Sequence, residues 1–338
     1  MADELPNLHG FTFIRCLGKG GMATVWEAEQ HEPKRKVAVK ILNDDISSRP
    51  QDVESFYAEA KSAGLLDHAN IVTVFEVGCQ AGHYYYVMEL AAGYDTGRWL
   101  ARKGKLRELD VLTVAESVAV ALDYAVRSIG LIHCDIKPAN IMVDGDGTVR
   151  ITDMGIARSI KGEYANEYIS GTPSYMSPEQ ARGDAELDAR ADIYSLGATI
   201  YHLLSGRALF AGKTDDEILE CQCVDQVPDV RSLNPEVSAP CAVMLAKFLA
   251  KDRVNRPENW QEAIAMIRAV LNYLEENMQG DLLGLTSCEA PSTMSLMPNS
   301  SETIEVAEAK TISPVKYWVL VALGAVAAFV AAFLLCQK

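Results

Sequence analysis

The chain has 338 residues and a formal net charge of −15, from 31 Lys and Arg against 46 Asp and Glu. This length allows one large or two modest domains, and the acidic balance argues against non-specific nucleic-acid binding, which needs a basic surface. The eight cysteines show no Cys-x-x-Cys spacing, so a reduced environment is expected. The first twenty residues lack the pattern of a secretory signal peptide, so we expect the N-terminal part to stay in the cytosol.

The N-terminal part of the sequence is predicted to form a hairpin with a glycine-rich turn. Residues 1–10 form a short polar lead-in, and residues 11–17 and 24–29 are predicted to be strands. Glycines between these strands can bring backbone N–H groups close to phosphate oxygens, because no Cβ intervenes. The turn is not a Walker A loop, since no Gly-Lys-Ser/Thr closes it. A glycine-rich hairpin alone is weak evidence of a phosphate site.

A lysine interrupts the next predicted strand, residues 37–42. Lys40 is the single charge in an otherwise apolar run. A charge there needs a partner, although the lysine stem could also carry the ammonium to solvent. The amphipathic helix predicted over residues 52–66 carries two acids that could pair with it, Glu54 and Glu59. Strands predicted at 71–77 and 83–90 would complete a five-stranded antiparallel unit.

The central feature of the sequence is the stretch 132–142, in which Asp135, Lys137 and Asn140 stand at fixed spacing. A carboxylate there could orient a hydroxyl, an ammonium could screen a phosphoryl oxygen, and an amide could hold a divalent metal. The stretch alone could also be an ordinary polar loop. A helix predicted over 109–128 precedes it, and Asp153-Met154-Gly155 follows a hairpin predicted from strands at 140–143 and 149–152.

The ordered set of these motifs resembles a protein kinase of the eukaryotic-like serine/threonine class, most similar to the bacterial members. The resemblance extends over residues 11–272, about three quarters of the chain. It implies an α+β, bilobal protein kinase fold over residues 11–278. The N-lobe, 11–90, would be a five-stranded antiparallel sheet with one helix, and the C-lobe, 93–278, would be mainly helical.

The resemblance also implies an ATP site. Lys40 would contact the α- and β-phosphates and pair with Glu59, which is preferred to Glu54 because Phe56-Tyr57-Ala58-Glu59-Ala60 aligns better with the family's helix. Met88 would lie at the back of the adenine pocket, and the backbone from Glu89 to Ala91 would read the adenine edge. The full set implied for ATP binding is Leu17, Gly18, Lys19, Gly20, Gly21, Met22, Ala23, Thr24, Val25, Ala38, Lys40, Glu59, Met88, Glu89, Ala91 and Met142.

Catalytic roles follow from the same resemblance. Asp135 would act as the catalytic base or orient the acceptor hydroxyl, and Lys137 would screen charge on the transferred group. Lys40 is also implied to be catalytic, through its contact with the α- and β-phosphates. Asp153 would bind Mg²⁺ between the β- and γ-phosphates, and Asn140 would bind a second ion, with Mn²⁺ as an alternative metal. Thr172, in Gly171-Thr172-Pro173, would position the substrate and favours serine/threonine specificity.

Two positions depart from the family pattern. Met154 replaces the usual Phe, and its adaptable apolar side chain should still pack below the ATP site. Cys134 stands where most relatives carry an Arg that pairs with a phosphorylated residue of the activation loop. Cysteine cannot make that contact. The hypothesis is that activity does not depend on loop phosphorylation through that route.

Three further residues are implied to hold the large lobe together. Glu179, in Ser177-Pro178-Glu179, should form a buried ion pair with Arg256. Asp192 should anchor the backbone of the catalytic loop from a central helix. Helices near 214–224, 237–250 and 257–276 would complete the lobe.

The C-terminal part has a different composition. Residues 279–316 are rich in Gly, Ser, Thr, Pro and acids, which predicts a flexible linker. Residues 317–336 contain no charge, and twenty helical residues span roughly 30 Å, the hydrocarbon thickness of a bilayer. Lys316, Tyr317 and Trp318 lie at one edge, where basic and aromatic anchors belong. We expect a single-pass anchor in the cell membrane with the kinase domain in the cytoplasm; a buried soluble helix is the alternative.

These observations predict an ATP-dependent serine/threonine protein kinase that phosphorylates proteins, including itself, in membrane-associated signalling. Gly324, Ala328 and Ala332 place small residues four apart and could form a homodimer contact. No nucleic-acid partner is expected. One alternative is a membrane-anchored pseudokinase that binds nucleotide as a scaffold, and another is a small-molecule kinase on the same fold.

Overall fold

The structure is a computed structural model that describes residues 5–154, 158–159 and 171–286. These residues belong to the first of the two units into which the chain divides, Met1–Thr286 and Ser287–Lys338. Within this part of the chain, no helix is both long enough and apolar enough to cross a membrane. The membrane helix predicted at 317–336 and most of the predicted linker lie outside the described residues.

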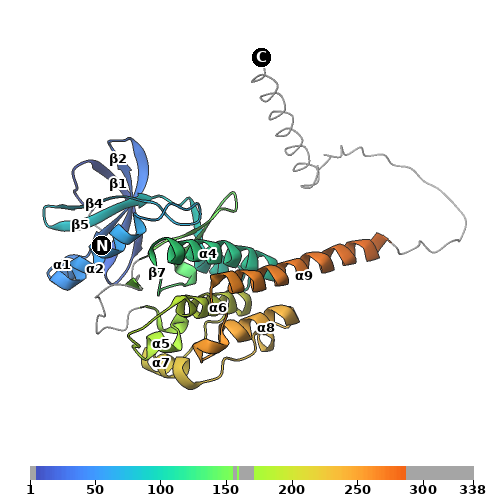
Figure 1. The fold of residues 1–338 in the computed structure, drawn as a ribbon. Coiled ribbons are helices and arrows are strands. Elements are labelled where there is room, and N and C mark those ends of the chain that lie inside the picture. Colours follow the sequence, from blue (N-terminus) through green and yellow to red (C-terminus); the bar gives the residue numbers. More distant parts are fainter. Residues whose placement is uncertain (1–4, 155–157, 160–170, 287–338) are drawn as a thin grey trace, which may run out of the picture. The chain divides into compact units, whose positions relative to one another are not determined.

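The small lobe is a five-stranded antiparallel sheet with one main helix (Figure 1). In spatial order its strands are β1 (Phe11–Lys19), β2 (Ala23–Gln30), β3 (Arg35–Leu42), β5 (His83–Glu89) and β4 (Val74–Gln80). Because side chains alternate along a strand, β3 sends Val37, Val39 and Ile41 into one apolar cluster and Ala38 and Leu42 into another. Both faces of the sheet are therefore packed.

The first cluster includes Leu8, which is 2% exposed. This residue belongs to the lead-in predicted from the sequence, so the end of that segment is part of the small-lobe core.

The second face of the sheet is covered by α2 (Pro50–Ala63), which follows the short helix α1 (Asp44–Ser47). Pro50 suits the first turn, where its missing N–H leaves no hydrogen bond unmade. The helix buries Phe56, Ala60 and Ala63, as its amphipathic pattern predicts, and ends before the predicted residue 66.

The fourth strand of the sequence begins later than predicted. Residues 71–73 do not belong to β4, because this segment hydrogen-bonds to the other lobe. The Ile151 N–H donates to the Asn70 carbonyl at 2.8 Å, and the Val72 N–H donates to the Ile151 carbonyl at 2.9 Å. The backbone of the small lobe is thereby joined to a strand of the large lobe.

The large lobe is mainly helical, so the bilobal α+β fold predicted from the sequence is confirmed. Its helices are α3 (Thr96–Lys103), α4 (Glu108–Ile129), α5 (Pro178–Ala181), α6 (Ala189–Ser205), α7 (Asp215–Val224), α8 (Ala239–Phe248) and α9 (Trp260–Thr286). Its short strands are β6 (Gly93–Asp95), β7 (Leu131–Ile132), β8 (Ile141–Asp144), β9 (Val149–Ile151) and β10 (Arg158–Ser159). Single 3₁₀ turns are η1 (Pro138–Asn140), η2 (Pro173–Tyr175), η3 (Val230–Ser232) and η4 (Arg253–Asn255). Helix α9 runs past residue 276, where the sequence-based helix was expected to end.

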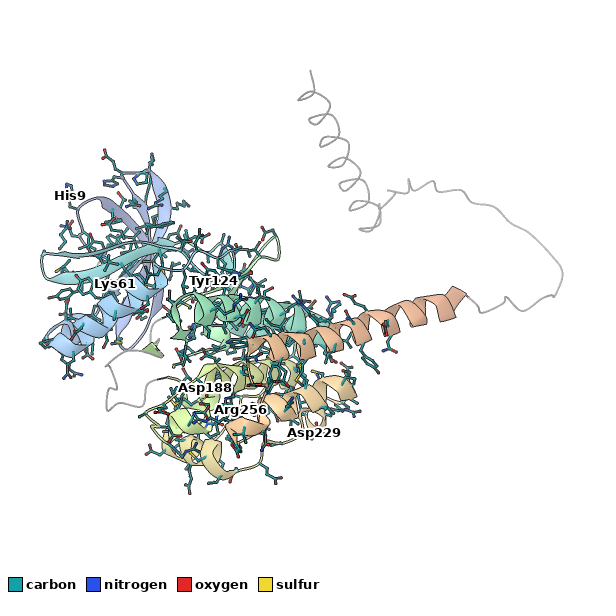
Figure 2. All side chains as sticks on the ribbon, viewed as in Figure 1. His9, Lys61, Tyr124, Asp188, Asp229 and Arg256 are labelled. Atoms are coloured by element: carbon teal, nitrogen blue, oxygen red, sulfur yellow. The ribbon has the colours of Figure 1, made fainter. Side chains whose placement is uncertain are left out.

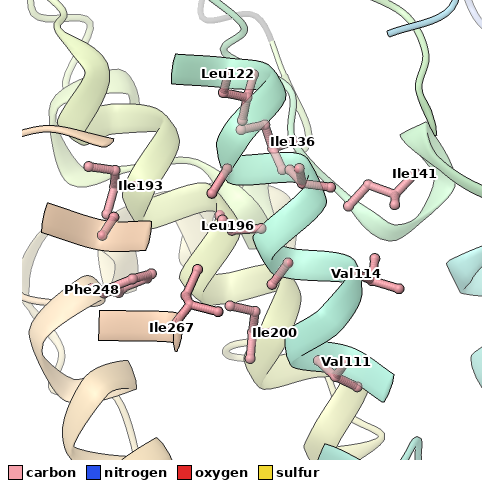
Figure 3. Packing of buried hydrophobic residues seen from close by; sticks show 14 of the residues in the cluster. Val111, Val114, Leu122, Ile136, Ile141, Ile193, Leu196, Ile200, Phe248 and Ile267 are labelled. Atoms are coloured by element: carbon pink, nitrogen blue, oxygen red, sulfur yellow. The ribbon is translucent and has the colours of Figure 1, made fainter. Parts of the chain in front are cut away.

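Helix α6 is the centre of this lobe, and nearly all of its side chains are buried. Figure 3 shows Ile193, Leu196 and Ile200 of this helix packed among residues of α4, α8 and α9. At Gly197 an added Cβ would come within 2.9 Å of the Phe248 Cβ. Glycine therefore lets α8 approach α6 closely at this point. A rigid central helix can hold the segments that lie beside it.

The expected ion pair between Glu179 and Arg256 is present and fully enclosed. The Arg256 guanidinium donates to both carboxylate oxygens of Glu179, at 2.7 and 2.9 Å. It also donates to the carbonyls of Arg190, Ala250 and Lys251. Figure 2 labels Arg256 within the helical lobe. One guanidinium therefore joins α5, the start of α6 and the segment after α8.

Replacing Arg256 by Met should lower the free energy of unfolding by about 3–5 kcal/mol, because it leaves the Glu179 carboxylate buried without its cation. Urea denaturation followed by circular dichroism measures the change. Arg268→Met is the matched control: Arg268 pairs with Glu116 on an exposed face, and loss of such a pair costs about 0–1 kcal/mol. Equal stability of both variants would contradict this role for Arg256.

Candidate active site

The backbone of residues 132–142, the predicted catalytic loop, is fixed by a buried carboxylate of α6. Asp192 accepts hydrogen bonds from the backbone N–H groups of His133, at 2.7 Å, and Cys134, at 2.8 Å. Burial raises the pKa of Asp192 above its ordinary value. Cys134 adopts a φ of +65°, which costs a residue with a Cβ roughly 1–2 kcal/mol. The Gln180 side chain donates to the Cys134 carbonyl at 2.8 Å, so both neighbouring peptide groups are held in this unusual turn.

Asp135 lies at the centre of four donors. Its Oδ2 accepts from Lys137 Nζ at 2.7 Å and from Asn140 Nδ2 at 3.1 Å. Its Oδ1 accepts from the Thr172 N–H and hydroxyl, both at 3.2 Å. Lys137 also donates to the Thr172 hydroxyl oxygen at 2.8 Å. The carboxylate is thus oriented, and it already accepts a hydrogen bond from an alcohol of the type found in Ser and Thr.

Lys40 lies between two carboxylates that come from different lobes. Its Nζ is 2.9 Å from Glu59 Oε1 and 2.8 Å from Asp153 Oδ1. Burial works against the charge on Lys40, but the adjacent carboxylates outweigh it and raise its pKa well above the ordinary value. Burial alone would raise the pKa of Asp153, yet the ammonium lowers it below its usual range. Both groups are therefore charged at neutral pH.

The glycine-rich turn leaves room beside its backbone. An added Cβ at Gly18 or Gly21 would meet no atom within 4 Å, which suits a segment whose amides face phosphate oxygens. The turn is closed by the Gly20 N–H donating to the Ala23 carbonyl at 2.9 Å. Asn43, the residue after β3, holds the turn, because its side-chain amide donates to the carbonyls of Gly20 and Gly21, both at 3.1 Å.

Most of the apolar residues expected around adenine lie on the face of the small-lobe sheet that α2 also covers. One cluster contains Ala38 and Met88, with Leu17, Val25 and Ala91 packed against it. Met142 does not belong to this cluster; it lies on β8, opposite Asp95 and Arg150 in register. At the end of β5, Arg150 Nε lies 3.3 Å from Glu89 Oε1, and the Glu89 N–H donates to the Thr73 carbonyl.

The donor set fits a divalent cation that shares its ligands with phosphates. Asn140 uses its Nδ2 for Asp135, which leaves the amide oxygen for a metal, and Asp153 uses Oδ1 for Lys40, which leaves Oδ2. In the described part of the chain, no group of three or more His, Cys, Asp and Glu residues could hold a metal ion. Two side-chain oxygens, completed by a nucleotide and water, are the arrangement that Mg²⁺ commonly accepts.

The structure therefore brings together the residues predicted for the catalytic, metal and phosphate positions, and it shows three contacts that were not predicted. Tyr86 donates to Glu59, Asn43 braces the glycine-rich turn, and Gln180 holds the catalytic loop. Strand alternation places Tyr86 on the same face as Met88, and Ser177-x-x-Gln180 is a capping-box pattern. The sequence thus contained a signal for Tyr86 and Gln180. For Asn43 no such signal exists, because its role depends on the fold of the preceding turn.

Residues 11–267 match the family described as protein kinase domain. The chain is 33% identical over 265 residues to the serine/threonine-protein kinase PrkC of Bacillus subtilis (strain 168), a match covering 78% of this chain and 40% of PrkC. It is 38% identical over 205 residues to the serine/threonine-protein kinase PknA of Mycobacterium tuberculosis, covering 59% of this chain and 47% of PknA. The matched part thus spans less than half the length of these curated relatives.

A similar solved structure is the crystal structure of a mutant of the Mycobacterium tuberculosis PknI kinase domain. The TM-score is 0.63 at 26% sequence identity, and the alignment covers 78% of this chain and 96% of that domain. The similarity in structure therefore extends through both lobes.

Replacing Asp153 by Asn should weaken Mn²⁺ binding in the presence of a non-hydrolysable ATP analogue by about tenfold or more, since a charged oxygen ligand becomes neutral. Electron paramagnetic resonance titration of Mn²⁺ measures it. Asp146→Asn, in the exposed turn between β8 and β9, is the control and should bind Mn²⁺ like the wild type. If Asp153→Asn also binds Mn²⁺ like the wild type, Asp153 is not a metal ligand.

Proposed function

Because this chain belongs to the protein kinase family, we propose that it transfers the γ-phosphoryl group of ATP to Ser and Thr hydroxyls of proteins, including its own. The observation that carries this proposal is the Asp135–Lys137–Thr172 arrangement, in which one carboxylate accepts a hydrogen bond from a hydroxyl beside an ammonium. The serine/threonine kinases to which the chain is similar support the same activity.

The geometry explains how such a transfer proceeds. Phosphoryl transfer needs little covalent chemistry from the protein, so positioning and charge neutralisation account for most of the rate. Asp135 orients the acceptor hydroxyl and can accept its proton, while Lys137, 2.7 Å away, neutralises charge on the transferred group. Lys40 contacts the α- and β-phosphates, and its bond to Glu59 fixes its position. Mg²⁺, or Mn²⁺ in its place, would neutralise the phosphate oxygens at Asp153 and Asn140.

A protein acceptor is favoured over a small molecule by the segment that holds Thr172. Gln222 of α7 donates to the Pro173 carbonyl at 3.1 Å, and the Tyr175 hydroxyl lies 2.7 Å from His202 Nδ1. The segment is thus supported from two helices immediately beside Asp135. A fixed surface next to the acceptor hydroxyl suits a polypeptide, which needs more than its hydroxyl to be positioned.

A nucleotide-binding pseudokinase is the alternative. The described site contains every group that the chemistry needs: Lys40, Glu59, Asp135, Asn140 and Asp153 all lie in contact with a partner that orients them. A scaffold would not require the Thr172 bridge between Asp135 and Lys137. These contacts favour the active enzyme.

Wild-type protein incubated with labelled ATP and Mg²⁺ should phosphorylate itself and a generic protein substrate on Ser and Thr. Asp135→Asn should lower the rate by about 10²–10⁴-fold, because it removes the acceptor for the hydroxyl proton, while ATP affinity stays the same. Asp146→Asn, which changes an exposed acid, is the control. ATP binding without any label on Ser or Thr would favour the pseudokinase.

We further propose that residues 317–336 anchor the protein in the cell membrane, with the kinase domain on the cytoplasmic side. Support comes from the sequence: the segment has no charge, it is long enough to span the hydrocarbon, and it begins with Tyr317 and Trp318 directly after Lys316. Gly324, Ala328 and Ala332 support a homodimer through this segment.

The full-length protein should remain in the membrane pellet after carbonate extraction. Val326→Arg should release a large fraction, because arginine at the centre of a membrane helix costs about 2.5–3.5 kcal/mol. Val306→Arg, outside the segment, is the control. Release of the wild type by carbonate would exclude the anchor.

In membranes that hold the full-length protein, Gly324→Leu should reduce chemical cross-linking of two copies.

A further inference from the structure

A tyrosine of β5 contacts the ion pair that positions the phosphates of ATP. Tyr86 is 2% exposed, and its hydroxyl donates to Glu59 Oε1 at 2.7 Å. The same oxygen accepts from Lys40 Nζ at 2.9 Å. Glu59 Oε1 therefore has two donors, one from each of two neighbouring strands, while Glu59 itself belongs to α2.

The ring of Tyr86 also fixes the surroundings of this oxygen. Its centroid lies 5.1 Å from that of Phe56, one turn before Glu59 on α2. Lys40 Nζ lies 5.5 Å from the ring centroid, within the range of a cation–π contact. One side chain of the sheet thus contacts the helix, the carboxylate and the ammonium.

The hydroxyl of Tyr86 is a donor over the whole physiological pH range. Burial, together with the adjacent Glu59 carboxylate, raises the pKa of Tyr86 well above its ordinary value. A tyrosine that remains protonated can only be satisfied here by donating to the carboxylate that it faces. The Tyr86 hydroxyl is therefore protonated and available to donate at neutral pH.

Lys40 has a second carboxylate within reach, and this makes the position of Glu59 important. Asp153 lies 2.8 Å from the ammonium and is more exposed than Glu59, with side chains 35% and 7% exposed. If Glu59 moved outward with α2, Lys40 could remain paired with Asp153 alone. The hydrogen bond from Tyr86 to Glu59 therefore helps to keep the Lys40 ammonium between Glu59 and Asp153.

We propose that Tyr86 is a positioning residue for phosphoryl transfer: its hydroxyl holds Glu59, and through Glu59 it holds Lys40, by a contact made within the small lobe. This inference rests on the proposed kinase function, and it explains why the Lys40–Glu59 pair is formed in this structure. No additional partner would then be needed to keep α2 against the sheet.

The test uses the full-length protein and the variant Tyr86→Phe, which keeps the ring and its packing. The ratio kcat/KM for ATP should fall about tenfold, as expected for loss of a hydrogen bond to a charged group, while the protein stays folded and its melting temperature falls by only a few degrees. Tyr85→Phe is the matched control. Tyr85 precedes Tyr86 on β5 and lies on the opposite face of the sheet, where its hydroxyl donates to Glu76 at 3.3 Å. The Tyr85→Phe variant should retain wild-type kinetics.

A double-mutant cycle separates this role from packing. In a Glu59→Ala background, which removes the acceptor, Tyr86→Phe should change kcat/KM less than about twofold, because the hydroxyl acts through the Glu59 carboxylate. Effects of the two substitutions that multiply, or wild-type kinetics of Tyr86→Phe alone, would overturn the inference.

A second measurement does not need turnover. Acetylation of Lys40 by acetic anhydride, followed by mass spectrometry, should be several-fold faster in Tyr86→Phe than in the wild type or Tyr85→Phe. Unchanged acetylation would overturn the role of Tyr86 even if the wild type transfers no phosphate. Faster acetylation in an inactive protein would support the contact and contradict only the kinase function.

Discussion

The ammonium group of Lys40 lies between a carboxylate of the small lobe, Glu59, and a carboxylate of the large lobe, Asp153. An isolated charge in this partly buried position would be strongly unfavourable, so the lysine and the two acids stabilise one another only when both lobes are in place. The backbone contacts between Asn70, Val72 and Ile151 join the same two lobes beside this point. One shared cation therefore joins Glu59 to Asp153, the residue proposed to bind the metal.

The acceptor side of the site depends on a different constraint, the buried carboxylate of Asp192. It holds two consecutive amides of the catalytic loop, and Cys134 is kept in a left-handed turn that an unsupported residue would avoid. Asp135 is the next residue, so the orientation of its side chain depends on how α6 holds the two residues before it. The uncharged side chain of Cys134 offers no cation to a phosphorylated loop. Asp192 thus holds the acceptor side of the site, and Tyr86 holds Glu59 on the phosphate side.

Much of this arrangement could be predicted because the chemistry needs particular residues in a fixed order. Lys40 stood out as a charge in an apolar strand, and the spacing of Asp135, Lys137 and Asn140 indicated their shared site. Contacts between distant segments were harder to predict. The hydrogen bonds of Asn70 and Val72 to β9, which shorten β4, depend on how the lobes meet. Strand alternation indicates the face on which Tyr86 lies, but its bond to Glu59 also depends on the depth at which α2 packs, which periodicity does not determine.

If the chain's own contacts complete the site, no phosphate is needed on residues 156–171, where Ser159 and Ser170 are the only Ser and Thr acceptors before Gly171. The most direct measurement is the initial rate at which phosphatase-treated full-length Ser159→Ala/Ser170→Ala protein phosphorylates a generic protein substrate. We predict a rate equal to that of the untreated wild type, with no lag. A large loss of rate that is restored by Ser170→Glu in the Ser159→Ala background would contradict this conclusion.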